Sequence, residues 1–281
     1  MLDHQFGAVP AYPGQFDRAN LLSRICVRPP YFALQNLHAD DGTFWATATA
    51  EQPVTSETGP MQASEISRHG AICGLCTVAL SFTDDERRYY LAQDAKYQGF
   101  ANAAPYGSVV SFEARLLEKN KRQATAEIIV TSSGHALAHL RVTYTILQEA
   151  SFKRLFRSRY SPTFSDFQWN RMPDPPAGEF SVSNETSIMT LKTVPEEACA
   201  GHFEHYPAMP VAVLMGQLGL VASREYDQPY RVESATMTAS DFCWAGECVR
   251  FEVTPSSERG MYQCMALASD KIVSEMTLRL V

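Results

Sequence analysis

The sequence predicts an α+β protein made of two tandem copies of one unit, each an antiparallel sheet wrapped around a central helix. Three observations predict it. The chain has 281 residues, which suits two units of roughly 100–150 residues better than one compact core. A helix-like segment followed by alternating strand-like segments occurs twice. Short stretches of the first half also match stretches of the second half in the same order.

These matches indicate an internal duplication. The matched pairs are residues 90–95 with 230–235, 107–113 with 246–252, and 135–139 with 271–275, at offsets of 140, 139 and 136. A slowly shrinking offset is what one or two shortened turns would produce. Two such units could pair their sheets edge to edge, which would remove one exposed edge from each.

In the first half, one central helix is expected at residues 62–80, where apolar and small residues recur at helical spacing. Residues 39–42 form a turn signal that ends in Gly42, so they predict a hairpin. The expected strands are 31–37, 43–50, 89–97, 108–118, 123–131 and 136–147. We expect the first unit to occupy residues 1–150.

A proline-rich stretch follows and predicts a linker over residues 151–179. The order then begins again in a second unit, residues 180–281. A helix is expected at 211–223, and strands at 180–191, 231–239, 247–253, 261–268 and 272–280.

Composition narrows the possible partners and location. Hydrophobic residues make up 45% of the chain and charged residues 20%, which is typical of a globular protein. The net charge of −7 argues against nucleic acid as a partner. No apolar run approaches the roughly 18 residues that span a bilayer, so no membrane partner is expected. The seven cysteines are odd in number and irregularly spaced, which predicts reduced thiols and a cytoplasmic location.

The segment 201–223 carries the clearest chemical signal. It contains Gly201, His202 and Phe203, then Pro207 and Pro210, and then an apolar helix. This arrangement resembles the motif that precedes the central helix of the β-hydroxyacyl-ACP dehydratases. The resemblance covers about 100 residues of the second half, and reaches the first half only through the internal repeat. It implies a double hotdog fold, in which two hotdog units are fused in one chain.

The resemblance also implies a reaction, the dehydration of a β-hydroxyacyl thioester of acyl carrier protein or CoA. His202 would be the base, and backbone N–H groups near Val211 would hold the thioester carbonyl. The acyl chain would lie between helix and sheet, and neither a metal nor a redox cofactor would be needed. The residues expected to contact substrate are Gly201, Phe203, Pro210, Val211 and Arg68.

Two positions depart from the family pattern. The family has a carboxylic acid six positions after the second proline, where this chain has Gly216, and a glycine where it has Val211. In the family, the acid that works with the histidine comes from the helix of the other copy. The first-half helix offers Arg68 by an ungapped match, His69 by a shift of one residue, and Glu65 as its only carboxylate. We favour His69 or Glu65 as the catalytic partner of His202, and expect the mirror-image site to be inactive.

These departures keep two other functions open. A hotdog thioesterase would use Glu65 to activate water or to attack the carbonyl. A non-catalytic protein that binds acyl groups or another hotdog subunit would leave His202 without a titratable hydrogen-bond partner. A homodimer of double hotdogs is compatible with each function.

Two further features have a structural and a functional interpretation. Residues 152–160 mix basic and aromatic side chains, which suits either a solvated linker or a docking patch for CoA phosphates or an acidic acyl carrier protein. Cys73 and Cys76 lie inside an apolar helix without a second cysteine pair, so we interpret them as packing thiols rather than a zinc or redox site.

Overall fold

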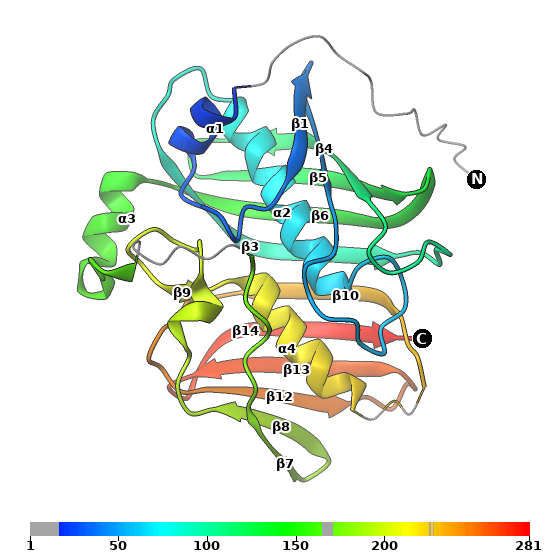
Figure 1. Ribbon diagram of the computed structural model, residues 1–281. Coiled ribbons are helices and arrows are strands. Elements are labelled where there is room, and N and C mark those ends of the chain that lie inside the picture. Colours follow the sequence, from blue (N-terminus) through cyan, green and yellow to red (C-terminus); the bar gives the residue numbers. More distant parts are fainter. Residues whose placement is uncertain (1–16, 165–170, 225, 227) are drawn as a thin grey trace.

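The structure is a computed structural model that describes residues 17–164, 171–224, 226 and 228–281. One antiparallel twelve-stranded sheet curves around two helices, α2 (Ala63–Leu80) and α4 (Val211–Ser223) (Figure 1). In spatial order its strands are β1 (Gln35–Asp40), β2 (Thr43–Ala48), β4 (Val110–Lys119), β5 (Gln123–Ser132), β6 (His135–Gln148), β3 (Arg88–Gly99), β10 (Val232–Ala239), β14 (Lys271–Leu280), β13 (Met261–Ala268), β12 (Val249–Pro255), β8 (Thr186–Leu191) and β7 (Glu179–Ser183).

Smaller elements lie around this sheet. They are the helices α1 (Arg18–Arg24) and α3 (Glu149–Leu155), the 3₁₀ turns η1 (Arg157–Arg159) and η3 (Glu196–Cys199), and the two-stranded sheet of β9 (Ala208–Met209) and β11 (Cys243–Trp244). No helix in the described ranges is both long enough and apolar enough to cross a membrane.

The strand order is symmetric about the pair β3–β10. Reading outward from this pair, each half runs through its last strand, two middle strands and finally an edge hairpin. Each half also wraps around its own helix (Figure 1). The chain therefore has the double hotdog fold that the sequence predicts.

The pairing registers repeat the offsets seen in the sequence. The β3–β6 pair Ala95↔Val142 has its counterpart in the β10–β14 pair Ala235↔Leu278, at offsets of 140 and 136. The irregularities in these two ladders also correspond, because one lies between residues 92 and 94 and the other between 232 and 234. A duplicated unit explains why the two halves share even their bulges.

The central helices lie deep in the molecule and pack on each other. Both are apolar around most of their circumference, as expected of helices enclosed by a sheet. At their crossing, a Cβ atom on Gly216 would lie 3.2 Å from the hydroxyl of Ser64. Gly216 therefore lets α4 approach α2 closely.

Two predicted strands differ from the observed ones. The first strand begins at Gln35 rather than at residue 31, because the chain turns where the Phe32 N–H donates to the Arg28 carbonyl. The run 180–191 is the hairpin β7–β8 rather than one strand. Asn184 and Glu185 both adopt the left-handed region, with φ of 49° and 65°, and so reverse the chain.

Within the predicted linker 151–179, residues 165–170 lie outside the described residues. The segment 152–160, which also falls in that linker, is helical rather than irregular. It forms most of α3 and all of η1, and its Phe152 is fully buried. The Phe152 ring stacks on Tyr89 with the ring centroids 3.6 Å apart. It also packs on rings of the second unit, so aromatic contacts hold this segment against both units, while its basic side chains face outward.

Candidate active site

The backbone conformation of the loop that carries His202 depends on the glycine before the histidine. Gly201 has a φ of 75°, and a Cβ atom there would collide with the Arg28 carbonyl and lie 2.8 Å from the Tyr31 nitrogen. The His202 N–H donates to the Cys199 carbonyl over 2.8 Å. The glycine of the motif is thus required by backbone conformation and by close approach.

One hydrogen bond fixes the tautomer of the His202 side chain. Its Nδ1 lies 3.0 Å from the Ala208 carbonyl oxygen, so Nδ1 carries the hydrogen and Nε2 keeps a free lone pair. Burial lowers the pKa of His202 to about 4, opposed by the bond to Ala208. The imidazole is therefore neutral at neutral pH and can accept a proton at Nε2.

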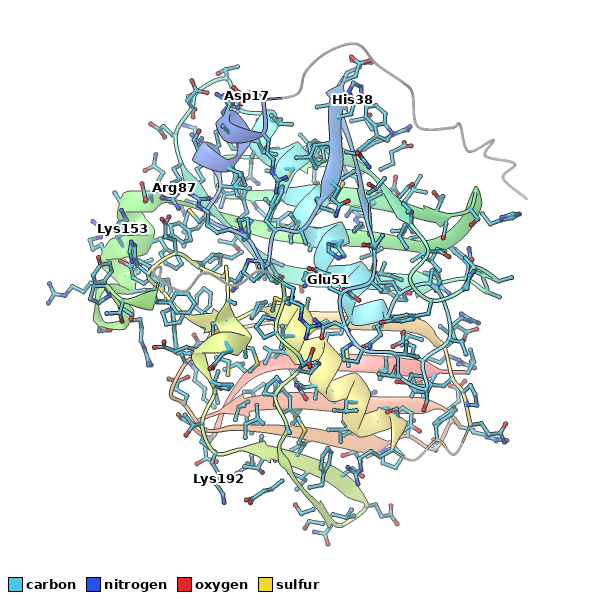
Figure 2. The ribbon with its side chains drawn as sticks, in the orientation of Figure 1. Asp17, His38, Glu51, Arg87, Lys153 and Lys192 are labelled. Atoms are coloured by element: carbon cyan, nitrogen blue, oxygen red, sulfur yellow. The ribbon has the colours of Figure 1, made fainter. Side chains whose placement is uncertain are left out.

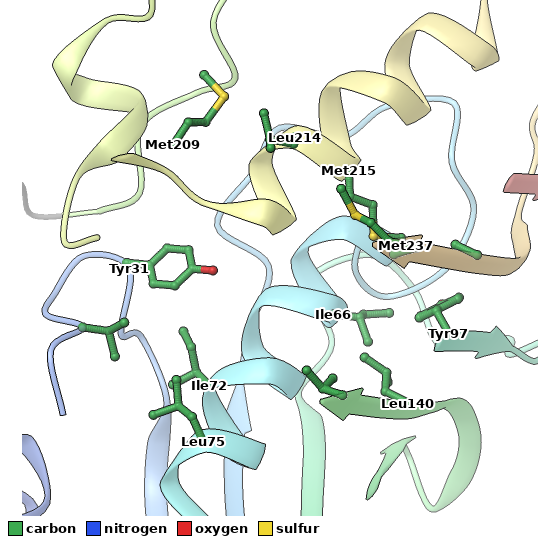
Figure 3. Packing of buried hydrophobic residues seen from close by; sticks show 14 of the residues in the cluster. Tyr31, Ile66, Ile72, Leu75, Tyr97, Leu140, Met209, Leu214, Met215 and Met237 are labelled. Atoms are coloured by element: carbon green, nitrogen blue, oxygen red, sulfur yellow. The ribbon is translucent and has the colours of Figure 1, made fainter. Parts of the chain in front are cut away.

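His202 lines a pocket of about 460 Å³ that lies beside the first turn of α4. Its walls are mainly apolar and come from both units, including Val27, Ile72, Leu75, Met209, Val211 and Leu214. Figure 3 shows Tyr31 reaching between Met209 and the side chains of α2. The exposed side chains Gln93 and Ser240 mark the end that opens to solvent.

The start of α4 has free hydrogen-bond donors, and its Val211 lines this pocket, whereas Ala212 lines the smaller pocket of Glu65 and Arg68. Pro210 caps the helix, and its carbonyl accepts the N–H groups of Val213 and Leu214. The N–H groups of Val211 and Ala212 have no acceptor within the described chain. Free amides at a helix start stabilise negative charge, as on a carbonyl oxygen under attack.

Glu65, Arg68 and His69 form a separate buried cluster on α2, each at most 3% exposed. The Arg68 guanidinium pairs with Glu51, lies 3.6 Å from Glu65, and donates to Nε2 of His69 over 2.9 Å. Burial holds the pKa of His69 well below its usual value and raises the pKa of Glu65, although Arg68 opposes the shift of Glu65. Figure 2 places Glu51 where the two central helices approach each other.

The structure does not bring this cluster to His202. Glu65 and Arg68 line a different pocket, of about 140 Å³, beneath residues 172–176. Within the described residues, no titratable side chain is hydrogen-bonded to His202. This is the arrangement that the non-catalytic alternative predicts for His202, and the catalytic roles of Glu65 and His69 stay predictions.

The N-cap residues of α2 and α4 show which positions of the two helices correspond. Gln62 and Pro210 are the N-cap residues, so Arg68 is the counterpart of Gly216. The position that holds an acid in the dehydratase motif is thus a cation in one half and a glycine in the other.

The ligand atoms of Glu51, Glu65 and His69 lie within 4.8 Å of one another, a spacing at which three residues can hold a metal ion. Arg68 contacts all three of these residues. Its guanidinium already supplies the positive charge that a metal ion would bring, so the cluster does not fit a metal.

The mirror-image position in the first unit is nearly filled. Its pocket measures about 40 Å³ and is lined by Tyr230 and Val232, the counterparts of Tyr90 and Ala92 in the large pocket. Glu57 closes it, because its carboxylate accepts the N–H of Ala63, the first residue of α2, over 2.7 Å. Of the two central helices, α4 therefore begins beside the large pocket and α2 beside smaller ones. The sequence offered no signal for Glu57 or for Tyr31, whose ring centroid lies 5.1 Å from that of His202.

Comparison with known proteins finds similarity in fold but none in sequence. No family model matches the sequence, and no curated protein matches it. An acyl-ACP thioesterase from Bacteroides thetaiotaomicron is similar in structure, with 10% identity and a TM-score of 0.60 over 85% of this chain and 98% of that one. A 12:0-ACP thioesterase from Umbellularia californica gives 8% identity and a TM-score of 0.58 over 87% and 99%. A tesB protein from Mycobacterium avium gives 9% identity and a TM-score of 0.53 over 87% and 94%.

Proposed function

We propose that the protein is an enzyme that hydrolyses acyl thioesters at one site, the pocket beside α4. The observation that carries this proposal is the neutral His202 imidazole, which lines a large apolar pocket together with a helix start whose amides are free. The named thioesterases of similar fold support the same class of substrate.

In the proposed reaction, the acyl chain lies in the pocket and the thioester carbonyl faces the amides of Val211 and Ala212. Nε2 of His202 takes a proton from water as the water oxygen bonds to the carbonyl carbon. The amides stabilise the resulting oxyanion. When the oxyanion collapses, the C–S bond breaks and the thiolate takes the proton from the imidazolium. The products are a free acid and a thiol.

The leaving group favours hydrolysis over dehydration. A thiolate leaves with little help, because the pKa of a thiol is about 8.5, whereas hydroxide is the base of an acid with a pKa of about 15.7. Dehydration therefore needs a strong proton donor opposite the base. Arg68 and Gly216 occupy the positions for that donor. Asp241 also lines the pocket. Burial raises the pKa of Asp241, but pairing with Lys271 outweighs burial, so the pKa is lowered and Asp241 is ionised.

Dehydration remains the second candidate, because one observation favours it. The motif that resembles the dehydratases places His202 beside the start of α4, as that resemblance implies. His202 itself would then return the proton to the departing hydroxyl.

The test uses purified protein with a panel of saturated, 3-hydroxyacyl and 2-enoyl thioesters of CoA and pantetheine. Free thiol and enoyl absorbance are followed together. We expect thiol release, and a loss of about 10²–10⁴-fold in His202→Ala. His205→Ala, on the same loop, serves as the matched control and should keep activity.

The other outcomes reassign the function. Enoyl change without thiol would establish the dehydratase. Thiol release that survives in His202→Ala but disappears in Glu65→Gln would move the base to α2. Thioester binding with neither signal would make the protein a non-catalytic acyl-binding module.

A further inference from the structure

The segment that includes α3 and η1 is strongly basic in an acidic protein. Residues 149–160 contain four cationic side chains and one acid, whereas the whole chain carries a net charge of −7. All four cations are exposed. Lys153 pairs with Glu149 over 3.0 Å and Arg159 pairs with Glu247 over 2.7 Å. Figure 2 shows Lys153 at the outer edge of the molecule.

Two of these cations, Arg154 and Arg157, form no ion pair with any described residue, and they lie three positions apart. Apolar surface lies between and beside them, because Leu155 is 62% exposed and Tyr160 is 51% exposed. An apolar centre with a charged rim is typical of a protein interface.

The inner side of the same segment reaches the large pocket. Phe152 packs on Phe203 with a centroid distance of 5.6 Å, and Phe156 packs on Phe242 at 5.0 Å. Phe203 and Phe242 both line the pocket of His202. Two contacting pairs of aromatic rings thus lie between the basic surface and the pocket.

We propose that the exposed face of α3 and η1 docks an acidic carrier protein, which delivers the acyl group on a pantetheine arm into the pocket of His202. This proposal rests on the proposed hydrolysis. Charge complementarity favours a carrier protein, because opposite charges guide and orient protein encounters. The alternation of arginines with exposed apolar side chains suits a protein surface better than the phosphates of CoA, which would need cations that converge on one point.

The test compares one acyl group on three carriers: an acidic acyl carrier protein, CoA and free pantetheine. Arg154→Glu/Arg157→Glu is measured beside Lys96→Glu/Arg259→Glu, which makes the same charge change at exposed residues away from α3. We expect kcat/KM for the carrier-bound thioester to fall at least tenfold in the first variant only. The value for pantetheine should change less than twofold, and high salt should weaken wild-type turnover of the carrier-bound substrate.

The outcomes separate this proposal from the proposed function. An equal fall for CoA and carrier substrates would assign the arginines to phosphate binding and overturn the carrier proposal, as would unchanged turnover of the carrier substrate. Binding of the thiol form of the carrier is titrated in parallel. Leu155→Ala removes apolar surface from the docking face without changing its charge, and it should also weaken this binding. If no thioester is hydrolysed but the carrier binds wild type and not Arg154→Glu/Arg157→Glu, hydrolysis fails and the docking surface stands.

Discussion

The pKa of a single histidine determines how the proposed reaction depends on pH. Burial lowers the pKa of His202 to about 4, and the neutral form is the one that accepts a proton. We therefore expect kcat/KM to stay flat from pH 8 down to about pH 5 and to fall only as pH approaches 4. The measurement is a pH–rate profile with a thioester that is stable over this range. An acid limb near 6.5, the usual pKa of histidine, would contradict the proposed environment of His202.

The same shift has a consequence for stability. Unfolded His202 binds a proton near pH 6.5, whereas the folded protein resists protonation until the pH approaches 4. The contribution of His202 to the free energy of unfolding is therefore fully present above pH 6.5. It decreases as the pH falls from 6.5 to about 4, because only the unfolded state gains a proton there.

Arg68 supports a different kind of prediction, because its charge is structural. It is 3% exposed and compensates Glu51 and Glu65. We expect Arg68→Met to lower the free energy of unfolding by about 3–5 kcal/mol, since it leaves the buried Glu65 and the half-buried Glu51 without a counter-ion. Urea unfolding measures this effect. The triple variant Glu51→Gln/Glu65→Gln/Arg68→Met should recover much of the loss, and equal instability of the single and triple variants would show that packing, not charge, sets the cost.

At the scale of residues, the sequence predicted those site residues that belong to a short continuous motif. The loop of His202 was recognisable because its glycine and two prolines lie within ten residues of each other. Tyr31 and Glu57 reach their sites only through folding, and neither belongs to a motif. The register of α2 against His202 was also out of reach, because it depends on how two helices cross.

At the scale of elements, two glycines of the central helices, Gly74 and Gly219, differ in the space around them. A Cβ on Gly74 of α2 would collide with the Tyr144 hydroxyl and lie 3.2 Å from the Ala126 Cβ, whereas a Cβ on Gly219 of α4 would meet nothing within 4 Å. We expect Gly74→Ala to destabilise by about 1–3 kcal/mol through overpacking. Gly219→Ala should instead stabilise by about 0.5–1 kcal/mol, because alanine favours the helix. Thermal unfolding of both variants checks the pair, and the same sign for both would contradict the packing described.

Elements were predicted well where their pattern is internal to the segment. Both central helices and most strands follow from periodicity, and their observed bounds differ by few residues. The hairpin β7–β8 was missed because its turn contains Asn184 and Glu185 without a glycine, and glutamate is a rare residue at positive φ. α3 was interpreted as linker because its fixed position comes from Phe152 packing on distant rings rather than from its own sequence.

At the scale of the whole molecule, the duplication creates one sheet out of two. The junction is the ladder between β3 and β10, with pairs running from Gln98↔Ser234 to Asp94↔Thr238. Further bonds cross it, such as that from the Arg231 guanidinium to the Gly99 carbonyl over 3.0 Å. The shrinking offset made this duplication visible in the sequence, but only the pairing shows that the halves share a continuous sheet. Each half thereby covers an edge strand that it would otherwise expose.

A shared sheet predicts that the two halves unfold together. Trp45 lies in β2 and Trp244 in β11, so each reports on one half. In a Trp169→Phe background, which removes the remaining tryptophan, the single-tryptophan variants Trp244→Phe and Trp45→Phe follow the halves separately. We expect their fluorescence transitions in urea to coincide with each other and with the loss of circular dichroism, because separating β3 from β10 would leave backbone N–H and C=O groups of both strands unpaired. Thr236→Pro places a proline at the centre of β10. If it shifts the urea midpoints of both fluorescence transitions equally, the coupling between the halves lies in this ladder. Two separate midpoints in the unsubstituted sheet would instead mean that the units fold independently and that their contact adds little stability.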